Sequence, residues 1–280
     1  MSSPTRPIVR LAFVTLALGA WGCVGQRAQL SQLLEARRLA SDIHVEFTKA
    51  TEAANRAVMA DTDEASAAAA DEARRARQSV ERDVEALAKT LESVGFVDDK
   101  RSLDAFTDRF AEYRRLDDEI LPLAVENTNL KAQRLSFGPA QEAAEAFRAA
   151  LAGGARTAAG CCGDANANRA RAALLEIQVL QAPHIAESDD AAMTRIESRM
   201  KELAGAARAA IDELKAPAAA AALDRFMGIN DEIVALSRRN SNVRSLALSL
   251  GRKRMVTAEC EDDLRALEDA LAKHEFSATR

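Results

Sequence analysis

Two segments of this chain are each repeated further along it, and this internal repeat restricts the possible folds more than any other feature. Residues 118–138 align without gaps on residues 231–251, with nine of 21 positions identical. Upstream, residues 59–65 (MADTDEA) resemble residues 185–191 (IAESDDA). The two pairs keep the same order, and their separations of 113 and 126 residues differ by only 13. The sequence therefore predicts a duplication, in which two related halves share one fold.

Both halves carry the apolar pattern of amphipathic helices. Apolar residues recur at alternating steps of three and four, for example at Leu33, Ala36, Ala40 and Ile43. Only 12 glycines and 6 prolines interrupt 280 residues, and aromatic residues make up 4%. This composition is typical of long helices packed side by side, and short turns between such helices make neighbours antiparallel. We predict an all-α protein of two antiparallel up-down four-helix bundles, arranged in tandem or stacked.

The duplication also suggests domain boundaries. Residues 26–152 are predicted to form the first four-helix bundle and residues 170–276 the second. Residues 153–169 are predicted to be a linker or a badly broken helix, because they contain four glycines, which disfavour a continuous helix. Residues 1–23 precede the bundles and are predicted to be a signal peptide or a membrane anchor.

The start of the chain has the features of an export signal. Arg6 and Arg10 form a basic front, and residues 11–22 are an uncharged run of largely apolar residues. That run is shorter than the ~20 apolar residues that span a bilayer. It ends in Gly22 and Cys23, which resemble the cleavage and lipidation site of a bacterial lipoprotein. Lipidation of Cys23 is therefore predicted.

Two other interpretations of this segment stay open. An uncleaved anchor could span residues 7–25, with the Arg10 side chain reaching the membrane interface. The protein could also be secreted without an anchor. All three interpretations place the rest of the chain outside the cytoplasm, and the first two predict a membrane-anchored protein of the bacterial cell envelope that faces the periplasm or the exterior.

Charge and motifs exclude several classes of function. The formal net charge is −5, whereas a nucleic-acid-binding protein needs a basic face. No nucleotide-binding glycine loop, serine-nucleophile elbow or metal-binding His-Glu-x-x-His or paired Cys-x-x-Cys motif occurs in the sequence. The three histidines, at positions 44, 184 and 274, are widely separated. We expect no cofactor, no metal site and no enzymatic activity.

Three motifs resemble a known family. Residues 55–61 (NRAVMAD) lie at the turn between the first two predicted helices, and residues 123–132 (LAVENTNLKA) and 136–139 (SFGP) precede the fourth. The sequence resembles the four-helix-bundle sensor domains of bacterial methyl-accepting chemotaxis receptors and related sensor kinases. The resemblance extends over nearly all of residues 26–275, once in each copy.

This resemblance implies detection of a small molecule, or of a ligand-loaded binding protein, outside the cytoplasm. It also implies a homodimer packed through the first helix. Aspartate-type receptors use several arginines on that helix, but here only Arg56 stands in that part of the first copy, and Ala182 replaces it in the second. An amino-acid ligand is therefore not implied. The chain carries no signalling region before Arg280, so we expect a partner protein to transmit any signal.

Five polar residues are the candidate ligand-binding groups: Arg56, Asn127, Asn129, Asn240 and Asn242. The two Asn-x-Asn motifs occupy equivalent positions in the repeat. Asparagine also favours helix ends and can set the register of packed helices, so the alternative is a structural role. Arg56 is predicted either to be a solvated surface residue or to share a pocket with the asparagines, since both lie at a similar depth from the helix ends.

The cysteines are predicted to have different roles. Cys260 falls on the apolar seam of the last helix and is expected to be a core thiol. The adjacent Cys161 and Cys162 could be free, bridge two chains or form a strained ring with each other. The leading functional hypothesis is a sensor that binds a ligand and acts through another protein. The alternative is a ligandless helical adaptor or structural envelope lipoprotein.

Overall fold

The computed structural model describes residues 14–157 and 161–274, and the side chains of residues 29–155 and 163–274. Helices account for nearly all of these residues, and none of them lies in a strand. The predicted all-α class is confirmed.

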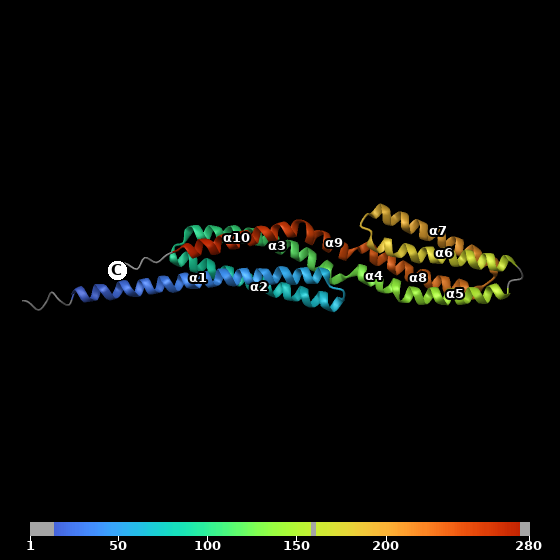
Figure 1. Cartoon of the computed structure of the whole chain (residues 1–280), viewed down its shortest axis with the longest axis horizontal. Coiled ribbons are helices and arrows are strands. Elements are labelled where there is room, and N and C mark those ends of the chain that lie inside the picture. The colour runs from blue at the N-terminus through green and yellow to red at the C-terminus, as the bar shows by residue number, and fades with distance from the viewer. Residues whose placement is uncertain (1–13, 158–160, 275–280) are drawn as a thin grey trace, which may run out of the picture. The chain divides into compact units, whose positions relative to one another are not determined.

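Helices follow one another along the chain with short connections (Figure 1). Three of the breaks are very short: one residue separates α3 from α4, α4 from α5, and α8 from α9. The elements are α1 (Val14–Met59), α2 (Asp63–Val94), α3 (Val97–Glu126), α4 (Thr128–Phe137), α5 (Pro139–Thr157), α6 (Cys161–Ala186), α7 (Asp190–Leu214), α8 (Pro217–Arg239), α9 (Ser241–Leu248), the short π-helix η1 (Ser249–Lys253) and α10 (Arg254–Lys273).

The chain forms two compact units that are interleaved along the sequence. Unit 1 contains Met1–Ala54, Asp71–Asp117 and Arg252–Arg280, and most of its described residues belong to α1, α2, α3 and α10. Unit 2 contains Asn55–Ala70 and Asp118–Gly251. This division differs from the predicted succession of bundles, residues 26–152 and then residues 170–276. The second segment of unit 2 begins and ends with the repeated motif, at Asp118 and Gly251.

Contacts between the two ends of the chain explain this division. The Arg37 side chain on α1 donates hydrogen bonds to the Leu271 and His274 carbonyls at the end of α10, at 3.0 Å each. His44 on α1 lies 3.1 Å from Glu268 on α10. The last helix therefore completes unit 1. Sequence periodicity finds the helices but does not show which of them pack together.

The structure describes most of the segment that was predicted to be a linker or a broken helix. Residues 153–157 continue α5, and residues 161–169 belong to α6, so the described part of residues 153–169 is helical. Gly154 has a packing role in unit 2: a Cβ atom at this position would lie 2.7 Å from the Cβ of Ala216. The glycine permits close approach of two chain segments, which outweighs its low helix propensity.

The core of unit 1 is built around aromatic rings. Phe47 on α1 meets Phe106 and Tyr113 on α3 edge to face, with ring centroids 6.0 and 5.0 Å apart. Phe110 stacks between those two rings of α3. All four side chains are buried. The apolar faces of α1 and α3 thus meet in one core.

The core of unit 2 is mostly aliphatic and rich in alanine. Ala144, Ala170, Ala207 and Ala219 are buried on four different helices. Small side chains let helix backbones approach closely. Leu223 and other larger aliphatic residues fill the space between them.

Two helix starts are capped by the side chain of the preceding residue. The Thr62 hydroxyl accepts a 3.1 Å hydrogen bond from the Ala65 amide at the start of α2. Asp189 accepts a 2.7 Å hydrogen bond from the Ala192 amide at the start of α7. Such caps satisfy amides that have no partner within the helix. The two capped turns lie in the shorter repeated motif.

Part of the predicted export signal lies outside the described residues. Residues 1–13 are not described, and from residue 14 to residue 28, including Cys23, only the helical backbone of α1 is. Among the helices that the structure describes, none combines the length and the apolarity needed to cross a membrane.

The interleaved arrangement predicts where a core mutation acts. Leu264 on α10 is fully buried in unit 1, so Leu264→Asp places a charge in that core. Because α10 contacts α1 and α3, hydrogen exchange measured by mass spectrometry should show lost protection first in these two helices. Leu223→Asp, equally buried on α8, is the matched control and should loosen α5 to α7 first. Loss of protection in α6 and α7 after Leu264→Asp, with α1 and α3 unchanged, would contradict this arrangement.

Candidate functional site

The four predicted asparagines come together in unit 2, where α3 gives way to α4 and α8 gives way to α9. Asn127 and Asn240 occupy the single residues at these breaks, and both adopt a left-handed backbone, with φ of 52° and 54°. Asparagine tolerates this conformation better than most residues with a Cβ atom. The repeated asparagine is therefore the residue at which each helix breaks.

The residues after each break bind one another reciprocally. The Thr128 amide donates to the Ser241 hydroxyl and the Ser241 amide donates to the Thr128 hydroxyl, each at 3.0 Å. The Asn129 amide donates to the Asn242 side chain and the Asn242 amide returns the bond to Asn129, each at 3.1 Å. We call residues 127–129 and 240–242 the asparagine crossing.

The asparagine side chains continue the same symmetry. Asn242 donates its side-chain amide to Asn127 at 2.7 Å, and Asn129 donates to Asn240 at 2.8 Å. Glu126 and Arg239 are the residues that immediately precede Asn127 and Asn240, and they form an ion pair with each other. Each half of the repeat thus supplies the hydrogen-bond partners of the other.

The crossing also holds the two capped turns. Asn240 donates to the Glu187 carbonyl at 2.7 Å, and Asn127 reaches the Thr62 carbonyl at 3.5 Å. Asn129 donates to the Ile185 carbonyl at 2.7 Å. The longer and the shorter repeated motifs of the sequence therefore meet in space.

This geometry favours the structural interpretation of the asparagines. Three of the four are buried, and their amide groups are used by one another and by the turns. A direct contact with a ligand remains a prediction for these four residues. Arg56 is exposed near the end of α1, and neither of the two clefts described below is lined by it or by the asparagines.

The cysteine predictions are only partly covered by the described residues. Cys260 is a free thiol that is fully buried on α10, as predicted, and burial raises its pKa to about 12. The side chains of Cys23, Cys161 and Cys162 lie outside the described residues. Their predicted lipidation and pairing therefore stay predictions.

Polar side chains enter the core of unit 2 next to its apolar layers. Gln181 on α6 donates to Asn230 on α8 at 3.0 Å and accepts from the Ser136 hydroxyl on α4 at 2.7 Å. His184, one turn further along α6, lies 2.6 Å from the Ser237 hydroxyl on α8. All five side chains are buried, and each has a partner.

Glu197 on α7 links this core to the surface. It lies 2.9 Å from the second ring nitrogen of His184 and accepts a 2.6 Å hydrogen bond from Arg238 on α8. The hydrogen bond from Arg238 lowers the pKa of Glu197 below its ordinary value, although partial burial opposes this shift. The carboxylate thus stays charged at neutral pH and fixes α6, α7 and α8 to one another.

A cleft of about 240 Å³ opens beside these residues, between α7 and α8. Met200, Met227 and Val234 provide apolar surface, and Glu197 and Asn230 reach into it from the polar core. Lys201, Asp231 and Ala235 complete its lining. An apolar surface with a few polar groups of defined orientation is the usual form of a small-molecule site.

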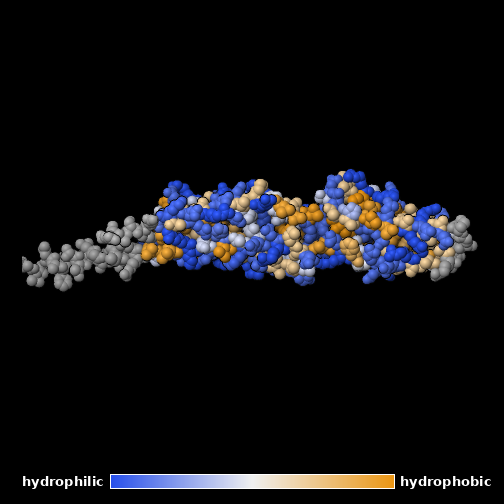
Figure 2. All heavy atoms as spheres, in the orientation of Figure 1, coloured by the Kyte–Doolittle hydropathy of each residue, from blue (hydrophilic) through white to orange (hydrophobic). Residues whose placement is uncertain are grey.

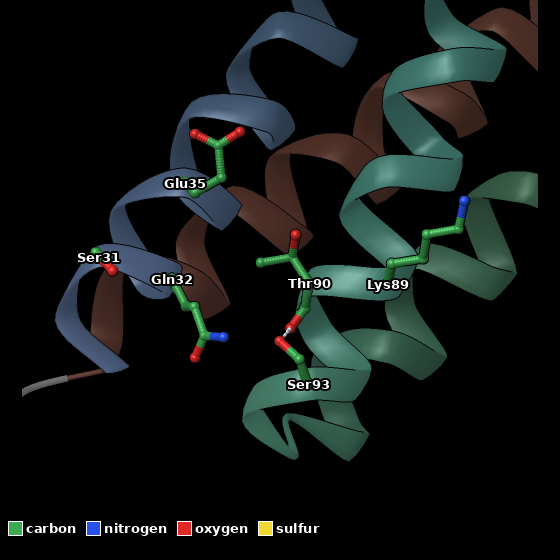
Figure 3. A pocket seen from close by; sticks show the side chains of 6 residues that line it. All are labelled: Ser31, Gln32, Glu35, Lys89, Thr90 and Ser93. Carbon is green, nitrogen blue, oxygen red and sulfur yellow. Dashed lines mark hydrogen bonds between the residues drawn. The ribbon is translucent and has the colours of Figure 1, made fainter. Parts of the chain in front are cut away.

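A second hollow, between α1 and α2 in unit 1, is lined only by residues with polar or charged side chains. Figure 3 shows Gln32 and Glu35 on α1 facing Thr90 and Ser93 on α2, with Ser31 and Lys89 at its edge. The Glu35 carboxylate is already bound by Arg38, and Lys89 pairs with Glu85. Because this hollow has no side chain from an apolar residue and the charges of Glu35 and Lys89 are already paired, it is a weaker candidate than the cleft beside Glu197.

Unit 1 also contains a buried ion pair that the sequence analysis did not predict. Lys253 in η1 lies 2.5 Å from Asp117 on α3 and 5.0 Å from the centre of the Tyr113 ring. Burial lowers the pKa of Lys253 and raises the pKa of Asp117, and the opposite charge of the partner opposes each shift. Arg77 on α2 approaches the same carboxylate at 3.8 Å. Removing one member of such a pair leaves a buried charge, so we assign it a structural role.

Sequence periodicity contained a signal for these buried polar groups. Lys253 precedes Val256 and Cys260 at seam spacing, and Gln181 falls four residues after the buried Ile177. A charged or polar residue on an apolar seam is a candidate for a buried network. The partners could not be inferred in this way, because they come from helices distant in sequence.

The described residues contain no group of three or more His, Cys, Asp or Glu side chains that could hold a metal ion. Comparison of the chain with protein-family models, with curated proteins and with solved structures gives no match.

The lowered pKa of Glu197 predicts how stability depends on pH. A carboxyl group whose pKa is lower in the folded state stabilises the fold above its ordinary pKa of 4.5, and this stabilisation is lost as pH falls through the folded value. Glu197→Gln should cost roughly 1–3 kcal/mol of unfolding free energy at neutral pH. The difference in unfolding free energy between this variant and the unmodified protein should shrink in acid. Urea unfolding at a series of pH values measures this difference. Glu232→Gln, at an exposed position on α8, should change little. A pH-independent loss in Glu197→Gln would contradict the assignment.

Proposed function

We propose that this protein is a sensor of the bacterial cell envelope that binds a small molecule in the cleft between α7 and α8. The cleft is the single observation that carries the proposal, because it combines apolar surface with polar groups held in place by the core. Filling it would affect the packing of α7 against α8. Ligand binding could then change the unit as a whole.

The finer architecture belongs to the same proposal. Each unit would be a four-helix bundle related to the sensor domains of chemotaxis receptors, with residues 1–23 attaching the chain to the membrane. The internal repeat and the all-α fold support this assignment. The protein would act without catalysis, through a partner that transmits the signal.

The lining of the cleft indicates the chemistry of its ligand. Met227 and Val234 favour an aliphatic or aromatic group, and methionine adapts its shape to different partners. Asp231 and Lys201 are exposed at the cleft and carry opposite charges. Glu197 is already paired with Arg238. We infer a small amphipathic molecule with a charged amine, a carboxylate or both.

Thermal unfolding of the full chain against a panel of small amines, carboxylates and zwitterions tests this function. A ligand at 100 times its dissociation constant adds about 2.7 kcal/mol, which corresponds to a shift on the order of 5–10 °C for a unit of this size. Met227→Trp should fill the cleft and remove the shift. Met255→Trp is the matched control, since Met255 is exposed on α10 in unit 1, and it should keep the shift.

The alternative is a ligandless helical adaptor. The asparagine crossing favours this alternative, because the predicted ligand-binding amides bind one another. If no compound in the panel shifts the transition, the adaptor becomes the better account. A shift that Met227→Trp leaves unchanged would reject the α7–α8 cleft as the site.

A further inference from the structure

Helix α6 has an apolar face that no other part of unit 2 covers. Its inward face packs in the core through Ala170, Leu174 and Ile177. On the opposite face a second row of residues is exposed, and Figure 2 shows hydrophobic side chains gathered along this part of unit 2. The row is Ala165, Asn168, Ala172, Leu175, Val179 and Ala182.

The spacing of this outer row is that of a coiled-coil seam. Its members alternate in steps of three and four, and the same spacing reaches Ala186 at the end of the helix. The row therefore covers just over three heptads, and every position in it is exposed. Leu175 and Val179 at its centre are 58% and 64% exposed, which is unusual for large aliphatic side chains in neighbouring turns.

The charged residues that flank the row determine what can cover it. In heptad terms Ala165, Ala172 and Val179 take the a positions, and Asn168, Leu175 and Ala182 take the d positions. In a parallel pair of such helices, each g position faces the e position of the following heptad in the partner.

If the partner is a second copy of α6, these flanking positions bring opposite charges together. Asp164 at g would face Arg169 at e of the second copy, and Arg171 at g would face Glu176 at e. Asp164, Arg169 and Glu176 are exposed, and Arg171 is partly exposed. Glu176 also binds Arg199 on α7 of its own chain, at 2.7 Å, and its exposed carboxylate can accept from both arginines.

An antiparallel pair does not give the same match. It sets g against g and e against e, and no single register then pairs Asp164 with Arg171 and Arg169 with Glu176. Asn168 would face its own counterpart in the parallel pair, where the two side-chain amides could form a hydrogen bond with each other.

We propose that the outer face of α6 is a dimerisation surface, on which a second copy of this chain docks its own α6 in parallel and in register. The seam is about 33 Å long at 1.5 Å per residue. It is short enough for reversible association. This proposal is independent of the cleft between α7 and α8, since none of its residues lines that cleft.

Cysteine cross-linking of the full chain tests the surface. In a Cys161→Ser, Cys162→Ser background, single variants Leu175→Cys and Ala182→Cys place one thiol at each of two d positions. In a parallel, in-register dimer each position faces itself, so both variants should form disulfide-linked dimers under mild oxidation. The matched control is Ser198→Cys, exposed on α7, which should give several-fold less dimer. Circular dichroism should show the same helicity for all three variants.

Other outcomes overturn the proposal. If the yield of disulfide-linked dimer at positions 175 and 182 does not exceed the yield at position 198, the links come from random collisions between chains and not from a specific dimer. Cross-linking at only one of the two seam positions would exclude a parallel, in-register pair.

A charge-reversal pair tests the partner directly. Arg169→Glu in the Leu175→Cys background should lower the dimer yield, because Asp164 of each chain would then face a like charge at position 169 of the other. Adding Asp164→Arg should restore the yield. Loss without restoration would contradict the predicted pairing of these residues.

Discussion

The reciprocal hydrogen bonding of residues 127–129 with residues 240–242 is the constraint on which the rest of unit 2 depends. Two helices break at equivalent residues, and each break exposes backbone amides that need partners. The Thr128 and Ser241 hydroxyls and the Asn129 and Asn242 side chains supply these partners across the repeat. A break in one copy alone would leave buried amides unsatisfied. The duplication and the crossing therefore explain each other.

The two units have cores of different character. Unit 1 combines a cluster of aromatic rings with one buried ion pair, whereas unit 2 places glutamine, histidine and asparagine side chains beside alanine-rich helix contacts. A chain of hydrogen bonds is sensitive to how its members are spaced, because a buried polar group without a partner is costly. The polar core of unit 2 thus provides a physical route by which occupation of the cleft could alter the positions of α6, α7 and α8.

Much of the local structure was predictable from the sequence. Apolar steps of three and four gave the helices, and Thr62 and Asp189 marked helix starts through the chemistry of their side chains. The repeat identified Asn127 and Asn240 as equivalent residues. Glycine content, in contrast, left residues 153–169 open between a linker and a broken helix, because the pattern does not distinguish a glycine that breaks a helix from one that permits close packing.

The pairing of distant helices was not predictable in the same way. Periodicity describes one helix at a time, so it does not show that α10 belongs with α1 or that Glu197 meets His184 and Arg238. The candidate asparagines were found, but their partners were not. A single sequence has no signal that residue 128 lies beside residue 241, apart from their equivalence in the repeat.

A disulfide between positions 128 and 241 tests the crossing most directly. The Thr128 and Ser241 hydroxyl oxygens lie 3.1 Å apart, so thiols in their place should react within one chain. In a Thr128→Cys, Ser241→Cys variant of the full chain, mild oxidation followed by peptide mass spectrometry should show an intrachain link between the two sites, with helicity retained. Absence of that link, or links only between different chains, would contradict the crossing and the structure built on it.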